Sequence, residues 1–199
     1  MGYVKKRIGQ LTKEYGNKTR ASKKLTEWFY TAVSNREVVE TKSTRARFQP
    51  GKIYIFKYAP KYVNELPWFD ENPVVLAIEE VGGNDFGVNL NLLPTDVKEQ
   101  LLDDLYERMA GIIKNTTSKT KDPMVESQLT ISYKGMKAYL KKFGCDFALR
   151  QYIPANKSEQ AVISYSKWPE IAMCDLMELN GTNIKEVLVM FADYFKKNI

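Results

Sequence analysis

Three consecutive apolar stretches in the middle of the chain predict β-strands. The first is rich in aromatic and β-branched residues, the second is continuously apolar, and the third alternates apolar with polar or small residues. These stretches span residues 52–58, 73–79 and 86–92. A Gly-rich turn at 81–85 predicts a hairpin between the second and third strands, and Gly87 predicts a bulge. We therefore expect a small, strongly bent antiparallel sheet of the SH3-like kind.

Helical periodicity follows these strands in three segments. We expect Thr95 to cap the first helix and Gly144 to end the second, which spans residues 132–142. Asn183 and Glu186 form a capping box for the third helix. The apolar stripes of the three helices are Val97, Leu101, Leu105, Met109 and Ile112; Met136, Tyr139 and Leu140; and Ile184, Leu188, Phe191 and Phe195.

Shorter elements lie between the second and third helices. Strand-like pieces occur around residues 152–153 and 161–163, and residues 167–170 predict a short helical turn. Taken together, these patterns predict that residues 48–199 form a single α+β domain, in which helices pack on the small bent sheet.

The first 47 residues differ from the rest and form a basic, partly helical arm. They contain 12 basic and four acidic residues, a net charge of +8, whereas the remaining residues carry −2 of the overall +6. One amphipathic helix is expected after a cap at Ser22, and it packs either on its own domain or on a neighbouring subunit. The apolar face of that helix is Leu25, Trp28, Phe29, Ala32 and Val33.

The charge of this arm points to a polyanion or an acidic protein surface as its partner. Clusters of lysine and arginine are typical of phosphate contacts. Nothing in the arm predicts sequence-specific readout of bases. The candidate DNA- or partner-binding residues are Lys5, Lys6, Arg7, Arg20, Lys23, Lys24, Arg45 and Arg47.

Composition argues against an enzyme. The chain has no histidine, which excludes Ser-His-Asp and Cys-His nucleophile arrangements and the usual Cys/His zinc sites. The Gly-rich segment 81–87 lacks the spacing of a phosphate-binding loop. We expect no catalytic residue, no metal and no cofactor. Cys145 and Cys174 are expected to be buried thiols of a protein made and kept in a cytoplasm, since neither a membrane span nor a secretory signal is evident.

Two further features bear on possible sites. Leu66, Trp68 and Phe69 fall in a loop between the first two predicted strands, and we expect them to be docked on the core or on a partner. Three acidic pairs lie at element boundaries or on a helix face, where solvated charge is favoured over metal binding. These pairs are Asp70-Glu71, Glu79-Glu80 and Asp103-Asp104.

The chain contains the motifs GKIYIFKYAPK (51–61), LPWFDENPVVL (66–76), FGVNLNLLP (86–94), RQYI (150–153) and WP (168–169). In this order and spacing, they resemble a family of tailed-phage virion proteins labelled DNA end protector, of the T-even type. The resemblance covers roughly residues 48–172. Trp68 and Phe69 stand where the family usually has two tyrosines, and Asn91 and Leu92 replace a His-Tyr pair.

This resemblance implies a virion component near the packaged DNA or the head–tail apparatus, made in the host cytoplasm. We expect the basic arm to bind the DNA end or an acidic neighbour, and the bound protein to block nucleases sterically, with an affinity that falls with salt. Expected partners are portal, neck or tail subunits and double-stranded DNA, within a symmetric assembly and without a membrane. The alternative is a purely structural tail, neck or baseplate subunit whose arm contacts no DNA.

Overall fold

A computed structural model describes most of the chain. The described residues are 2–35, 39–42, 47–61, 64–65, 69–115, 131–176 and, near the C-terminus, 186, 187, 189, 190 and 193.

The strands form one antiparallel sheet with the order β1-β6-β2-β3-β4-β5. Strands β2 to β5 are neighbours in chain order, and β6 returns to pair with β2 after a 3₁₀ turn at Pro154–Asn156. One antiparallel sheet combined with helices confirms the predicted α+β fold class. The strands are β1 (Val39–Lys42), β2 (Ile53–Tyr58), β3 (Val74–Val81), β4 (Asn84–Asn89), β5 (Leu149–Tyr152) and β6 (Lys157–Ile163).

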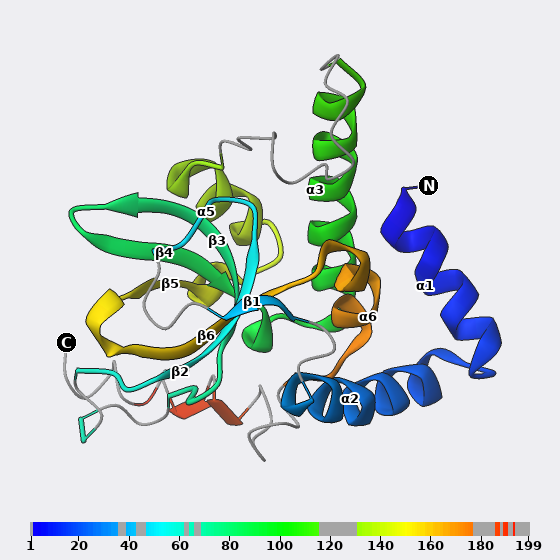
Figure 1. Cartoon of the computed structure of the whole chain (residues 1–199), viewed down its shortest axis with the longest axis horizontal. Helices are drawn as coiled ribbons and strands as arrows, with labels where there is room; N and C mark the ends of the chain where they lie inside the picture. The colour runs from blue at the N-terminus through cyan, green and yellow to red at the C-terminus, as the bar shows by residue number, and fades with distance from the viewer. Residues whose placement is uncertain are drawn as a thin grey trace.

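Both faces of the central strand β3 are buried, which explains its continuous apolar sequence. Val74, Leu76 and Ile78 belong to the main core, whereas Val75 and Ala77 belong to a second cluster of buried residues. Successive side chains of a strand point to opposite faces, so β3 separates the helices on one side from the inside of the bent sheet on the other. Figure 1 shows the sheet on one side of the molecule and most of the helices on the other.

The predicted bulge lies on the strand opposite Gly87. Ala77 pairs with Gly87 and Glu79 pairs with Phe86, so the extra residue is Ile78 of β3. Gly87 has a different role, because a Cβ atom there would lie 2.3 Å from Val75 Cγ1. The third predicted strand also ends earlier than expected, since residues 90–92 form a 3₁₀ turn.

The predicted hairpin turn and the helices after it are present. Gly82 and Gly83 have φ of 60° and 83° in the turn between β3 and β4. The carbonyl of Pro94, rather than Thr95, accepts the first backbone hydrogen bond of α3, from Lys98. Ser132 caps α5 and Gly144 follows its end with φ 65°. These helices are α3 (Thr95–Asn115), α5 (Tyr133–Lys141) and α6 (Trp168–Met173). The last predicted helix, with its Asn183 capping box, lies largely outside the described residues.

The N-terminal segment forms two helices, α1 (Tyr3–Glu14) and α2 (Lys18–Ser34), which we call the N-terminal helix pair. The sequence predicted one helix with a cap at Ser22, but α2 begins at Lys18, five residues earlier than that cap implies. The side-chain oxygen of Asn17 accepts a hydrogen bond from the backbone N–H of Arg20 at 2.9 Å, so Asn17 is the cap.

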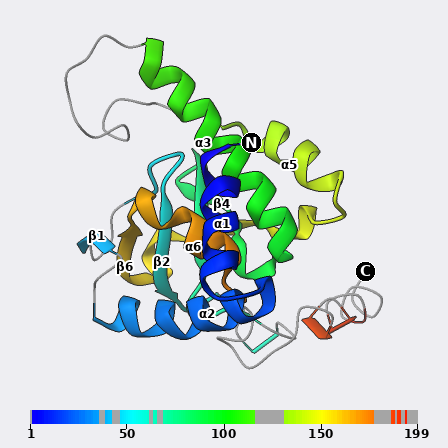
Figure 2. The same cartoon turned by 90° about the vertical axis from the view of Figure 1, so that its right-hand side faces the viewer.

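The N-terminal helix pair shares the main core with the rest of the chain. Helix α1 packs on α3 and α6, and α2 packs on α6, as Figures 1 and 2 show from two sides. Of the two predicted possibilities for the helix containing Leu25 and Phe29, the structure shows packing on its own chain. The division of the chain at residue 47 into arm and domain stays a prediction. The core residues of the pair are Val4, Ile8, Leu11, Ala21, Leu25, Phe29 and Ala32.

Candidate nucleic-acid interface

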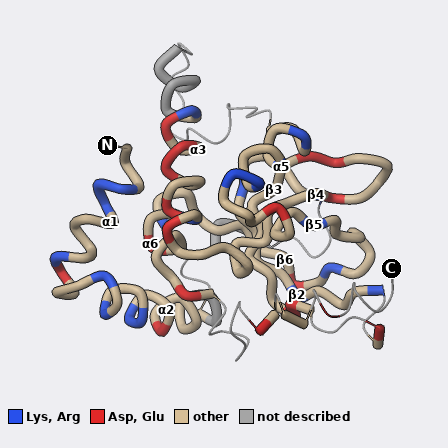
Figure 3. Tube along the Cα trace, turned by 180° about the vertical axis from the view of Figure 1, so that it is seen from behind, with Lys and Arg blue, Asp and Glu red and all other residues tan. Residues whose placement is uncertain are grey.

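The N-terminal helix pair carries the net positive charge of the protein. Residues 2–35 contain eight basic and two acidic residues, so their net charge of +6 equals that of the whole chain. Figure 3 shows this concentration as lysine and arginine along α1 and α2, whereas acidic residues follow one another along α3. The charge therefore belongs to two packed helices.

Helix periodicity directs much of this charge away from the core. In α1, Val4, Ile8 and Leu11 are buried, and Lys6 and Lys13 lie on the opposite side, two turns apart. In α2, helical periodicity likewise places Arg20 and Lys23 on the side of the helix opposite the buried Leu25. We call this surface the outer basic face. It consists of the exposed residues Lys6, Lys13, Arg20, Lys23 and Lys24, with the half-buried Arg7 at its edge toward the core.

A row of carboxylates on α3 holds the N-terminal helix pair in place. Glu99, Asp103 and Glu107 follow at four-residue spacing, which aligns them on one side of α3. Glu99 lies 2.8 Å from Lys18 Nζ, Asp103 accepts from the backbone N–H of Lys5 at 3.1 Å, and Glu107 accepts from that of Tyr3 at 3.1 Å. We call these three residues the acidic row. Their negative charges lie near the N-terminal ends of α1 and α2, where they interact favourably with the helix dipoles.

Among the predicted DNA- or partner-binding residues, Lys5 contacts the acidic row. Lys5 lies with its Nζ 3.8 Å from Asp103 Oδ2, so its ammonium group faces α3. Asp103 is 5% exposed, although its pairing with Asp104 had suggested solvated charge. That expectation was wrong because the carboxylate lies at the start of α1, where it accepts from the backbone N–H of Lys5 and pairs with the Lys5 ammonium group.

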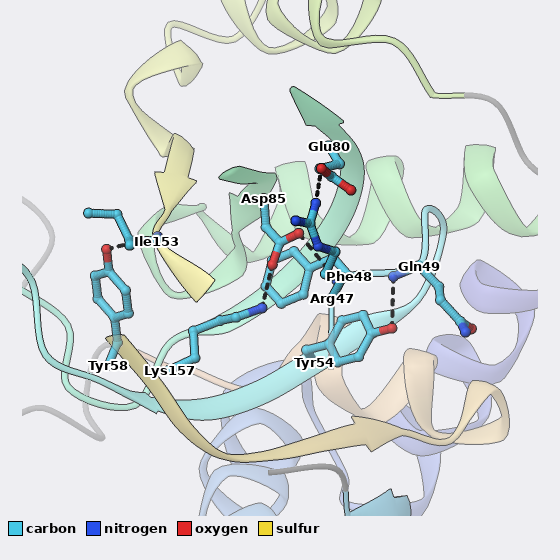
Figure 4. Close-up of polar contacts among 9 residues, drawn as sticks. All are labelled: Arg47, Phe48, Gln49, Tyr54, Tyr58, Glu80, Asp85, Ile153 and Lys157. Atoms are coloured by element: carbon cyan, nitrogen blue, oxygen red, sulfur yellow. Dashed lines mark hydrogen bonds and ion pairs between the residues drawn. The ribbon is translucent and has the colours of Figure 1, made fainter. Parts of the chain in front are cut away.

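A second predicted residue, Arg47, contacts the sheet instead of the acidic row. Its guanidinium pairs with Glu80 of β3, as Figure 4 shows. The backbone N–H of Phe48 donates to Asp85 Oδ1 at 3.3 Å, and Asp85 forms a fully buried ion pair with Lys157. The segment that begins at Arg47 and Phe48 is therefore held against the bent sheet by these contacts.

Aromatic side chains pack inside the bent sheet, beneath the segment that begins at Arg47. Lys157 Nζ lies 3.9 Å from the centre of the Phe48 ring, and Phe48 stacks on Tyr54 with ring centres 4.7 Å apart. Burial lowers the pKa of Lys157 and raises that of Tyr54, because each charged form is poorly solvated there. The cluster stabilises the barrel and explains why the chain buries a lysine.

The remaining predicted basic residues are distributed as follows. Lys24 Nζ lies 2.9 Å from Glu27, and a hydrogen bond and charge from Lys24 lower the pKa of that carboxyl. Arg7 donates to the side chain of Gln10 at 3.3 Å. Lys6, Arg20 and Lys23 are exposed and form no salt bridge within the described part of the chain; Arg45 lies outside it.

Two basic residues of the N-terminal helix pair were not among the predicted contacts. Lys13 is exposed and, like Lys6, lies opposite the buried side of α1. Its seven-residue spacing from Lys6 was the signal that could have identified it. Lys18 is also exposed but is paired with Glu99.

The predicted docking loop is described only in part. Leu66 and Trp68 lie outside the described residues, and Phe69 is half-buried beside a cavity of about 370 Å³ that also touches Tyr58. The next residue, Asp70, is buried, so the expectation of solvated charge was wrong there too.

Asp70 is buried because amide groups satisfy its carboxylate. It accepts from Asn89 Nδ2 at 3.1 Å and from Asn91 Nδ2 at 2.6 Å. Asn91 in turn accepts from the backbone N–H of Val74 at 3.2 Å. Asn91, which stands where the resembling family has histidine, therefore ties the loop to the sheet.

Other features of the described residues concern possible chemistry. Cys145 and Cys174 are buried free thiols, as predicted, and burial raises the pKa of Cys174 to about 12. No group of three or more His, Cys, Asp or Glu in the described ranges has the arrangement to hold a metal ion. Within those same ranges, no helix combines the length and apolar character of a membrane span.

Comparison with known proteins identifies the family. Residues 3–185 match the family model described as phage T4 terminal DNA protecting protein, and the chain belongs to that family. The match includes both N-terminal helices, whereas the sequence motifs had covered only residues 48–172. No curated protein and no solved structure matches the chain.

Proposed function

We propose that this member of the phage terminal DNA protecting family binds the end of a linear DNA duplex through its outer basic face. The observation that carries the proposal is the placement of the chain's whole net charge on two helices whose other side is fixed in the core. A phosphate backbone is the partner that such a surface favours. The bound protein protects the end sterically, and this mechanism needs no catalytic group.

The spacing of the outer basic face suits contacts to successive phosphates. Lys6 and Lys13 are seven residues apart in α1, a rise of about 10 Å, or about three base-pair steps of 3.4 Å. Arg20 and Lys23 are neighbours on the surface of α2. Four to six phosphate contacts predict an affinity that falls about 10²–10³-fold between 50 and 200 mM salt.

We also propose that the protein acts in the virion at the head–tail region, where a packaged DNA end meets portal, neck or tail subunits. The family description supports a role at the DNA end. A protein that contacts neighbours alone would use the same basic face against acidic protein surfaces, which makes DNA binding the deciding measurement.

The test is binding of purified protein to blunt linear DNA and to closed circular DNA over a salt series. The main variant is Lys6→Gln, Lys13→Gln, Arg20→Gln and Lys23→Gln combined. The matched control removes equal charge from exposed positions at α5, and consists of Lys134→Gln, Lys137→Gln, Lys141→Gln and Lys142→Gln. Protection is measured separately as the rate at which an exonuclease digests the linear DNA.

We expect the main variant to reduce the slope of log affinity against log salt by about 3–4 and to abolish protection. The α5 control should change both measurements little. Equal losses in the two variants would place the DNA elsewhere or make the binding diffuse. Absence of binding by the unchanged protein at moderate salt would refute DNA binding and favour the structural role.

A further inference from the structure

We propose that Tyr3 caps the terminal base pair of the bound duplex, with its ring stacked on the exposed base-pair face and Lys6 and Arg7 contacting the last phosphates. This inference rests on the proposed function and adds the group that distinguishes a DNA end from the interior of a duplex.

Charge alone does not recognise an end. The phosphates near a terminus resemble those in the interior, so contacts from lysine and arginine bind both. An end differs because its last base pair is stacked on one side only and presents a flat, apolar face to water. Aromatic side chains stack on bases irrespective of sequence. An end-binding surface therefore needs an exposed ring beside its cations.

Tyr3 provides such a ring in a fixed orientation. The residue is 39% exposed, and its ring lies parallel to that of Tyr106 on α3, with centres 4.3 Å apart and planes at 19°. Tyr106 lies 5.2 Å from Tyr165, which lies 4.7 Å from the fully buried Trp168. A base stacked on Tyr3 would extend this row of rings outward from the core.

The backbone of Tyr3 is fixed as well. Its N–H donates to Glu107 of the acidic row at 3.1 Å, and the residue opens α1. A ring that is already oriented loses little conformational entropy when it stacks on a base.

The neighbouring cations complete the arrangement. Lys6 and Arg7 follow Tyr3 by three and four residues, so all three side chains share one patch of the surface of α1. Lys6 is exposed and Arg7 is half-buried. One aromatic ring and two cations thus lie together at the start of the helix.

The experiment compares two duplexes of equal length and sequence, one with open blunt ends and one closed at both ends by hairpin loops. The variants are Tyr3→Leu, which removes the aromatic ring while keeping an apolar side chain, and Tyr3→Phe, which keeps the ring. Tyr30→Leu on α2 is the matched control, because Tyr30 is similarly exposed at 44%. Circular dichroism and the unfolding midpoint of each variant establish that α1 remains folded.

We expect Tyr3→Leu to lower affinity for the open duplex about tenfold and to leave affinity for the closed duplex unchanged. Tyr3→Phe and Tyr30→Leu should retain the preference for open ends. A 2-aminopurine base at the terminus should change its fluorescence when the unchanged protein binds, and should not do so with Tyr3→Leu.

Three results would overturn the inference, and they differ from failure of the proposed function. They are a retained end preference in Tyr3→Leu, an equal loss on both duplexes, and a loss that follows Tyr30→Leu instead. If the unchanged protein binds both duplexes equally, the phosphate contacts stand and the end cap is refuted. If it binds neither, the proposed function fails and the end cap fails with it.

Discussion

Replacing Asp103 should detach the start of α1. Gly2 precedes this helix and offers no capping side chain, and α1 has no acidic residue in its first turn. Asp103 of α3 supplies both the capping acceptor and the negative charge. Its Oδ1 accepts from the Lys5 N–H at 3.1 Å, and its charge lies at the positive end of the helix dipole. We therefore expect Asp103→Ala to lower the free energy of unfolding substantially.

The magnitude follows from the contacts that are lost. A lost cap costs about 1 kcal/mol, and a partly buried charge at a helix end contributes up to about 2 kcal/mol. The ion pair with Lys5 adds little, because the ammonium group lies 3.8 Å away and its side chain is 43% exposed. The expected loss for Asp103→Ala is about 2–3 kcal/mol. Asp103→Asn keeps an acceptor and loses the charge, so we expect about half that loss.

The assay is urea denaturation followed by circular dichroism, with the free energy of unfolding and its urea dependence fitted for each variant. Glu107→Ala is the control, because Glu107 is exposed and its bond to Tyr3 should contribute less than 1 kcal/mol. The expected order of losses is Asp103→Ala, then Asp103→Asn, then Glu107→Ala. A loss below about 0.5 kcal/mol for Asp103→Ala would show that α1 does not depend on this carboxylate.

Three further predictions concern the core. Burial lowers the pKa of Lys98 to about 8 in the folded protein. Between pH 8 and 10 this lysine is therefore protonated in the unfolded chain and largely neutral in the folded one, so the free energy of unfolding rises with pH over that range. Lys98→Met should abolish this rise between pH 8 and 10 in parallel denaturation curves, because methionine does not titrate. Lys157→Met should cost about 3–5 kcal/mol by leaving Asp85 buried and unpaired, and adding Asp85→Asn should recover most of that loss in a double-mutant cycle. Gly87→Ala should cost about 2–3 kcal/mol because its Cβ collides with β3, whereas Gly82→Ala, in open space at φ 60°, should cost about 1 kcal/mol, as thermal unfolding would show.

Much of the fold could be predicted because local periodicity coincides with burial. The continuous apolar run at 73–79 predicted a strand, and residues 74–78 are buried on its two faces; Ser132 likewise indicated the start of α5. Helix α1 was missed although Val4, Ile8 and Leu11 show helical spacing. Charged residues outnumber apolar ones there, and the pattern alone does not reveal that α3 and α6 cover the apolar side.

The candidate site was harder to predict, because charges are paired by tertiary contacts. Lys5 and Asp103 are 98 residues apart, and Arg47 meets Glu80 through the sheet. Nothing local distinguishes these cations from Lys6, which forms no salt bridge within the described ranges. Sequence reasoning could identify the basic segment, and packing was needed to separate the cations that hold the protein together from those left for a partner.

The attachment of the basic helices to the core bears on how protection would work. A flexible arm must become ordered when it binds, which reduces affinity, whereas α1 and α2 are ordered by their own core residues. In the proposed complex, a rigid attachment would hold the folded body beside the DNA end, where its bulk would exclude a nuclease. Phosphate contacts alone would let the protein slide along the duplex and expose the terminus. Lasting protection would therefore require a contact found only at the end, and under our proposal the exposed ring of Tyr3 beside Lys6 would supply it without reading the DNA sequence.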